Sequence, residues 1–254
     1  IAVPLDRLLS DHYAAERRAL IRPGEAWPEM PPAGDAGGDA WPATEMTAAP
    51  FGDAGFREGA YDTSYLCVVD KHGNAFSATP SDGSAAGPIV PGLGFLVSGR
   101  GTQSSTDPSH PAVLAPGKRP RLTPNPAIAM RDGHWIMPFG SPGNDVQPQA
   151  MTQVLLNMFA FGMTPQDAVE QPRFASFSYP RSSDPHPYSP GLMNLEGRFP
   201  GETAARLRAM GHDVAMWPDW DYAAGAVCAI LHDQKTGTME GGSDPRRPTA
   251  VVGW

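Results

Sequence analysis

The chain has 254 residues, a formal net charge of −8 and 41% hydrophobic residues. This composition indicates a globular, soluble protein, long enough for one large domain or two ordinary ones. The acidic balance argues against nucleic acid or a membrane surface as a partner, and no apolar run approaches the roughly 18 residues of a membrane helix.

The first 62 residues combine a helical opening with a long linker. Apolar residues recur at helical spacing between residues 4 and 22, whereas residues 22 to 60 are rich in Pro, Gly, Ala and acidic side chains and predict a mobile linker. Because the chain begins with Ile1 and no signal segment follows, we expect the later part of a longer precursor, with any targeting signal outside it and the compartment left open.

Residues 61 to 83 predict a β-hairpin. The apolar run from Tyr65 to Val69 suits a buried strand, Lys71-His72-Gly73-Asn74 supplies turn residues, and residues 75 to 79 return. Two small hydroxyl residues, Thr63 and Ser64, stand at the head of the first strand. On its own, a Thr at the start of a strand is most simply a good β-former.

In its context, with Asp62-Thr63-Ser64 placed after a linker and before an apolar strand, this stretch resembles the start of the catalytic subunit of the γ-glutamyltransferase (glutathione hydrolase) family. Members of that family are N-terminal-nucleophile hydrolases. The resemblance implies that the precursor cuts itself between Asp62 and Thr63. The hydroxyl of Thr63 then attacks an amide, with the freed α-amine as its base, because a peptide-bound nitrogen cannot take the proton.

The resemblance also implies the architecture and the partners. Residues 1–62 would be the tail of a large subunit with its linker, and residues 63–254 the small catalytic subunit, together part of one α+β domain, a four-layer αββα sandwich. The implied partners are the large subunit of the same precursor and a small-molecule amide, and such heterodimers can assemble into a homo-oligomer. No cofactor is expected, because nucleophile, base and oxyanion donors are all protein groups.

Further along, the pattern predicts loops, a second hairpin and three helices. A glycine-rich loop at 83 to 101 resembles the segment that walls the substrate pocket in the family. Residues 102 to 117 are predicted to form a second loop, and residues 178 to 192, which include four prolines, a third. The second hairpin spans residues 127 to 130 and 134 to 139. The three helices are predicted at about 146 to 161, 165 to 170 and 201 to 210. A last pair of strands is predicted at 226 to 231 and 238 to 240. The residues from Gly241 to Arg247 resemble the family's C-terminus.

Besides Thr63, three residues are candidates for the catalytic machinery: Ser81, Gly143 and Asn144. Gly140 to Asn144 joins a strand to a helix, whose unpaired N–H groups suit a developing oxyanion. The resemblance assigns the oxyanion donors to the backbone of Gly143 and Asn144, although the family usually has two glycines there. Ser81 falls where the family often has a second Thr that contacts the nucleophile. Thr79 lies on the same strand face as Ser81 and is a candidate for substrate binding. The plainest interpretation of the strand-to-helix turn from Gly140 to Asn144 is structural.

The substrate-binding positions depart from the family pattern. The family binds glutamate with an Asn, an acidic residue and a Ser-Ser pair, but Gly83, Gln103 and Leu122-Thr123 stand at these positions here. The charge that pairs with a substrate ammonium is therefore missing, while Arg100 can pair with a carboxylate. Three functions stay open: γ-glutamyl transfer or hydrolysis, hydrolysis of another small acidic or acyl amide of the oxamate or β-lactam acylase type, and an unprocessed scaffold without activity.

The remaining reactive residue types predict no metal or redox site. Cys67 and Cys228 each lie in an apolar, strand-like run and are expected to be small buried hydrophobic residues, with a disulfide left open. The seven histidines show no metal-ligand spacing, so we expect no metal.

Overall fold

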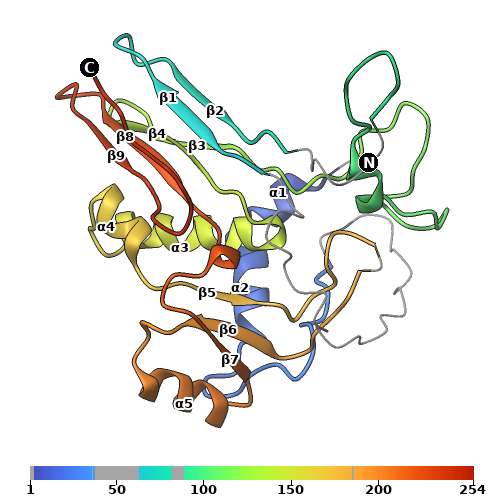
Figure 1. Cartoon of the computed structure of the whole chain (residues 1–254). Coiled ribbons are helices and arrows are strands. Elements are labelled where there is room, and N and C mark those ends of the chain that lie inside the picture. The colour runs from blue at the N-terminus through green and yellow to red at the C-terminus, as the bar shows by residue number, and fades with distance from the viewer. Residues whose placement is uncertain (1–2, 36, 38–62, 82–88, 185) are drawn as a thin grey trace.

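The computed structural model describes residues 3–35, 37, 63–81, 89–184 and 186–254. It is an α+β structure in which two sheets stack on each other, a helical layer covers one of them, and a third sheet of three strands lies below (Figure 1). The predicted helical opening is present as α1 (Leu5–Leu8) and α2 (Asp11–Ala19). Most of the predicted linker, residues 38–62, lies outside the described residues.

The first hairpin is confirmed. Strands β1 (Leu66–Val69) and β2 (Ala75–Ala78) pair antiparallel, and the Asp70 carboxylate organises the turn by accepting from the backbone N–H groups of His72 and Asn74. Side chains alternate between two faces, as a strand requires. One face meets the next sheet, whereas the other presents Leu66, Val68 and Phe76, each about half exposed.

The second sheet is entirely antiparallel, in the order β3-β4-β8-β9. It joins the second predicted hairpin, β3 (Ala127–Arg131) with β4 (Trp135–Gly140), to the last predicted strand pair, β8 (Cys228–Asp233) with β9 (Met239–Gly242). Met137 and Phe139 of β4 and Ala229 of β8 are buried on the face that packs against the helices. The opposite face receives the first hairpin, whose Tyr65 ring lies against Gly140.

Two predicted helices form the layer behind this sheet. Helix α3 (Gln147–Phe159) buries Ala150, Met151, Val154 and Met158, which repeat at helical spacing. Helix α4 (Pro165–Glu170) begins after Thr164, whose hydroxyl accepts from the Asp167 N–H as a helix N-cap. A stacked pair of rings, Trp135 and Phe159, 4.4 Å between centroids, ties the end of α3 to the sheet.

The third sheet was not predicted from the sequence. It contains β5 (Phe174–Ser176), β6 (Leu192–Glu196) and β7 (Asp213–Trp217), with β6 and β7 parallel and joined through the predicted helix α5 (Gly201–Ala209). Helix α3 holds it by side-chain bonds. The Gln149 and Gln153 amides, one turn apart, each donate to and accept from a backbone group of β5, at Ser176 and Phe174 respectively.

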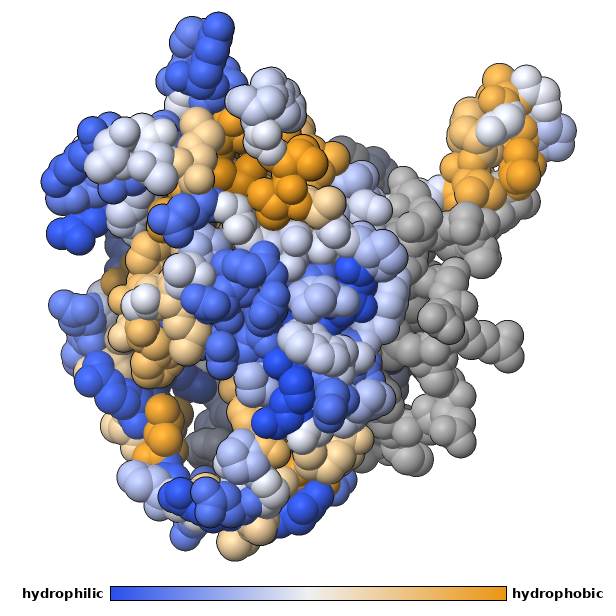
Figure 2. All heavy atoms as spheres, turned by 60° about the vertical axis from the view of Figure 1, so that its left-hand side comes forward, coloured by the Kyte–Doolittle hydropathy of each residue, from blue (hydrophilic) through white to orange (hydrophobic). Residues whose placement is uncertain are grey.

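The segment after the first hairpin is exposed and apolar. Ile89, Leu93, Phe95 and Val97 are each more than half exposed, and Figure 2 shows this apolar segment standing out from the body of the molecule. It leads into a short 3-10 helix, η1 (Gly99–Gln103). Among the described residues, no helix is long and apolar enough to cross a membrane.

Candidate active site

The ends of the first hairpin bring Thr63 and Ser81 together. The Ser64 N–H donates to the Pro80 carbonyl at 3.0 Å, so the pairing of β1 with β2 continues past both strands and sets Thr63 opposite Ser81. Their hydroxyl oxygens, Thr63 Oγ1 and Ser81 Oγ, lie 2.5 Å apart. A hydroxyl bonded this closely to a second hydroxyl has a path for its proton, which a nucleophilic oxygen needs.

Arg100 joins this pair from η1. Its guanidinium donates to the Ser81 hydroxyl, to the Ser81 carbonyl at 3.0 Å and to Thr123 Oγ1 at 3.1 Å. Ser98 caps the short helix by accepting from the Arg100 N–H, which fixes where the side chain starts. A positive charge therefore lies one hydrogen bond from Ser81 and two from Thr63.

Gln103 and Thr123 complete the chain of contacts. The Gln103 amide donates to Thr123 Oγ1 at 3.2 Å and accepts from the Thr123 N–H at 3.1 Å, and Gln103 is only 2% exposed. The residues that the sequence singled out from four separate segments thus form one continuous hydrogen-bonded cluster. In order along it they are Thr63, Ser81, Arg100, Thr123 and Gln103.

The turn from Gly140 to Asn144 lies beside the head of β1. A Cβ atom on Gly140 would stand 2.3 Å from the Tyr65 ring, so only a glycine lets the hairpin approach β4 here. Gly143 and Asn144 both have positive φ, 132° and 49°. Ser141 is fully buried, and its Oγ accepts from the Ala226 N–H at 2.9 Å, which fixes the turn to the neighbouring loop.

The two predicted oxyanion donors differ in their surroundings. When the Gln147 amide is oriented to suit its neighbours, its oxygen accepts from the Asn144 N–H at 3.0 Å and its nitrogen donates to Asn125 at 2.7 Å. Gly143 is constrained differently, because a Cβ there would stand 3.2 Å from the Gly225 Cα. Asn144 is thus already bonded in this structure, and its role as a donor stays a prediction.

With this geometry in place, comparison with known proteins decides the family. A family-wide sequence profile described as Gamma-glutamyltranspeptidase matches residues 1–254. The chain belongs to the gamma-glutamyltranspeptidase family.

Named relatives and solved structures agree with the family assignment. The oxamate amidohydrolase proenzyme of Klebsiella pneumoniae is 35% identical over 83% of this chain and 38% of its own length. The glutathione hydrolase-like YwrD proenzyme of Bacillus subtilis is 32% identical over 99% and 42%. The chain therefore spans about two fifths of the length of these relatives.

Among solved structures, LmbA2991HD superposes with a TM-score of 0.82 at 35% identity, covering 97% of this chain and 43% of that one. The cephalosporin acylase from Bacillus halodurans superposes with a TM-score of 0.72 at 28% identity, over 100% and 40%. The predicted α+β fold of the N-terminal-nucleophile hydrolase type is confirmed. The described part of this gamma-glutamyltranspeptidase-family chain supplies the two β layers and one helical layer of the sandwich.

Besides Gly143 and Asn144, three predicted positions stand outside the cluster. Thr79 Oγ1 is buried without a hydrogen-bond partner among the described residues. Asp62, on one side of the predicted cleavage site, and Gly83, predicted for substrate binding, lie outside the described residues. In the described part of the chain, no three His, Cys, Asp or Glu residues group as a metal site would require.

The space between the two sheets holds both cysteines. Cys67 and Cys228 are free thiols and half-buried, whereas the sequence predicted small buried residues and left a disulfide open. Burial raises the pKa of the Cys67 thiol to about 11 and also raises the pKa of Cys228. Burial likewise raises the pKa of the Tyr65 phenol, which hydrogen-bonds Ser77 at 2.8 Å.

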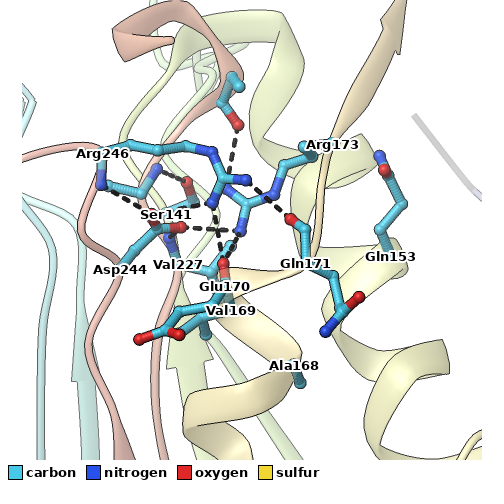
Figure 3. Close-up of polar contacts among 12 residues, drawn as sticks. Ser141, Gln153, Ala168, Val169, Glu170, Gln171, Arg173, Val227, Asp244 and Arg246 are labelled. Carbon is cyan, nitrogen blue, oxygen red and sulfur yellow. Dashed lines mark hydrogen bonds and ion pairs between the residues drawn. The ribbon is translucent and has the colours of Figure 1, made fainter. Parts of the chain in front are cut away.

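A cluster of buried charged residues lies next to the loop that contacts the turn from Gly140 to Asn144, and the sequence did not predict this cluster. Figure 3 shows Arg173 and Arg246 pointing toward Asp244, with ion-pair distances of 2.7 and 3.0 Å. Arg246 also bonds Glu196 at 2.6 Å, and all four residues are at most 6% exposed. We name Arg173, Glu196, Asp244 and Arg246 the buried charge cluster.

The buried charge cluster acts on the site through one short segment. Asp244 accepts from the Val227 N–H at 3.0 Å, and the adjacent Ala226 N–H donates to Ser141. The only sequence signal for it was the resemblance of residues 241 to 247 to the family's C-terminus. In this chain, the segment from residue 241 to 247 is thus linked to the turn at Ser141 through residues 226 and 227.

Proposed function

We propose that this chain carries the catalytic part of an N-terminal-nucleophile amide hydrolase or acyltransferase, with Thr63 as the nucleophile. The observation that supports it best is the 2.5 Å contact between Thr63 Oγ1 and Ser81 Oγ at the open end of the hairpin. A Thr hydroxyl is a weak nucleophile until a base takes its proton. Membership of the gamma-glutamyltranspeptidase family supports the same chemistry.

The first step is cleavage of the chain between Asp62 and Thr63. The Thr63 hydroxyl oxygen attacks the carbonyl carbon of Asp62, the C–N bond breaks, and an ester forms while the proton passes to the departing nitrogen. Water then hydrolyses the ester and leaves Thr63 with a free α-amine. The new amine is the base that the peptide-bound nitrogen cannot be.

The second step is turnover of an amide substrate. Thr63 Oγ1 bonds to the substrate carbonyl carbon, its proton moves through the α-amine to the leaving nitrogen, and the C–N bond breaks to give an acyl ester. Water or an acceptor amine then takes the acyl group and restores the hydroxyl. Ser81 holds the Thr63 oxygen in line, and the Gly143 and Asn144 N–H groups stabilise the oxyanion once the Gln147 amide turns aside.

A large subunit of the same precursor completes the enzyme. Leu66, Val68 and Phe76 form the outer face of the hairpin, and a soluble protein rarely leaves such an apolar strand face to water. We assign this face to the large subunit, and leave the assembly of heterodimers into a homo-oligomer as a further proposal. For the acyl group, γ-glutamyl amides and other small acidic amides are the two candidates, and the 35% identical oxamate amidohydrolase proenzyme favours the second.

Intact mass and N-terminal sequencing test the proposal, applied to a precursor in which a large-subunit segment precedes this chain. The wild type is expected to yield a fragment that starts at Thr63. Thr63→Ala is expected to stay uncut. Thr63→Ser keeps a hydroxyl and is expected to cut, but more slowly, whereas the neighbouring Ser64→Ala is expected to cut as the wild type does. A single uncut chain for the wild type would leave the alternative of an inactive scaffold.

A further inference from the structure

Among the described residues, Arg100 differs from the buried Arg173 and Arg246 in having no acidic partner. Arg173 and Arg246 are each paired with Asp244. The partners of the half-buried Arg100 guanidinium are instead two hydroxyls and one carbonyl, all uncharged. In the described ranges, no carboxylate lies within ion-pair distance of it. A partly desolvated charge without a counter-ion is costly, so the site is suited to an anion.

The guanidinium also keeps donors for such an anion. A guanidinium has five N–H groups, and Arg100 uses one on Nε, one on Nη1 and one on Nη2. Within the described part of the chain, one N–H therefore remains without a partner on each terminal nitrogen, which is what a carboxylate bound by both its oxygens requires. The hydroxyls of Ser81 and Thr123 hold the guanidinium in place, so little side-chain freedom is lost on binding.

The distance to the nucleophile limits the size of the anion. Nη2 bonds Ser81 Oγ, which bonds Thr63 Oγ1. Two hydrogen bonds of about 2.8 Å span at most about 5.6 Å. A carboxylate on Arg100 therefore lies only a few bonds from the carbonyl that Thr63 attacks.

We propose that the acyl group of the substrate carries a carboxylate that Arg100 binds, so that the substrates are monoamides of short dicarboxylic acids. This inference rests on the proposed function of Thr63. It also explains a difference from γ-glutamyl recognition. A substrate ammonium brought beside Arg100 is repelled, and Gln103, whose amide is engaged with Thr123, offers it no negative charge.

Isosteric amide pairs test the proposal in the cleaved enzyme. Oxamate and succinamate carry the carboxylate, oxamide and succinamide replace it by a neutral amide, and L-glutamine adds an ammonium group. Ammonia release is expected to give a kcat/KM for each monoamide about 30-fold or more above that of its diamide, the lower end of what a desolvated charge pair contributes. A wild type that prefers the diamides or glutamine overturns the proposal.

Variants assign the preference to one residue. Arg100→Gln is expected to reduce the ratio of monoamide to diamide kcat/KM by about 30-fold, mainly through KM, and Arg100→Lys to keep part of it. Arg119→Gln is the matched control, since Arg119 is exposed and has no hydrogen bond or ion pair among the described residues. An unchanged ratio in Arg100→Gln refutes the assignment.

Self-cleavage is measured beside turnover so that two failures can be told apart. If no fragment starting at Thr63 forms, the proposed function fails and this inference fails with it. If the fragment forms and diamides are hydrolysed as well as monoamides, only the inference fails. Should Arg100→Gln not cleave itself, the wild-type comparison of oxamate with oxamide decides, because it needs no variant.

Discussion

Replacing Asp244 by Asn removes one charge from the buried charge cluster while keeping the shape of the side chain. Asp244 meets four N–H groups: Oδ2 those of Arg173 and Val227 at 2.7 and 3.0 Å, and Oδ1 two from Arg246, both at 3.0 Å. An Asn has one acceptor oxygen, so two of these donors would face its NH₂ group. Removing one partner of a buried ion pair costs about 3–5 kcal/mol, and we expect the free energy of unfolding to fall by that amount.

Urea unfolding of the precursor, followed by tryptophan fluorescence, measures this loss. Trp220 is a suitable reporter because its ring stacks on the guanidinium of Arg198 at 3.5 Å and lies 5.0 Å from that of Arg246. Asp132→Asn, in the exposed turn between β3 and β4, makes the same chemical change and is expected to shift the free energy by less than about 0.5 kcal/mol. An Asp244→Asn precursor that unfolds within about 1 kcal/mol of the wild type refutes the reasoning.

Three further predictions concern pH, packing and the third sheet. Burial alone would raise the pKa of Glu196, but the Arg246 hydrogen bonds and charge outweigh it and hold the pKa below its usual 4.5. The folded protein therefore loses stability as pH falls below that value, and unfolding curves of Glu196→Gln are expected to show a smaller loss between pH 5 and pH 3, roughly the acid range of carboxylates. Gly140→Ala places a methyl group on the Tyr65 ring and is expected to slow the appearance of the Thr63 fragment by about tenfold, since small displacements at a reacting centre are costly; an unchanged rate would contradict the close approach. Gln153→Ala leaves the backbone N–H and carbonyl of Phe174 without their partners and is expected to lower the free energy of unfolding by about 1–3 kcal/mol, with faster hydrogen exchange in the third sheet. Gln166→Ala, on α4, is the control, because it leaves the bonds of the third sheet intact and should not speed its hydrogen exchange.

Local signals made much of this fold predictable. The first hairpin follows from its turn residues, and α4 follows from Thr164 as a cap with a Pro next to it. The third sheet gave no such signal, because β5 has three residues and β6 reads Leu-Met-Asn-Leu-Glu, without a β-branched residue. Its strands are fixed by α5 and by the glutamines of α3, which are contacts distant in sequence.

The site was predictable as a set of residues but not as a set of contacts. The resemblance singled out Thr63, Ser81, Arg100, Gln103 and Thr123, and the structure brings them into one cluster. How η1 folds against the hairpin decides that Arg100 bonds Ser81 and that no carboxylate of the described residues pairs with it. The buried charge cluster was not predicted from the sequence. Asp, Glu and Arg are normally surface residues unless they are paired, and their pairing is visible only in the folded chain.

The hairpin and η1 contribute different parts of the site, and the bonds from Arg100 to Ser81 join them. Strand register sets Thr63 against Ser81, so a single inserted residue in either strand would turn the proposed nucleophile, Thr63, to the opposite face. The residues proposed to select the acyl group, Arg100 and Gln103, instead belong to a short helix, which is held by side-chain bonds and by a backbone bond from the Asp184 N–H to the Thr102 carbonyl at 2.9 Å. We expect substitutions in η1 to change the acyl preference without changing the strand register that places Thr63, which would let one scaffold acquire new substrates without rebuilding its hairpin.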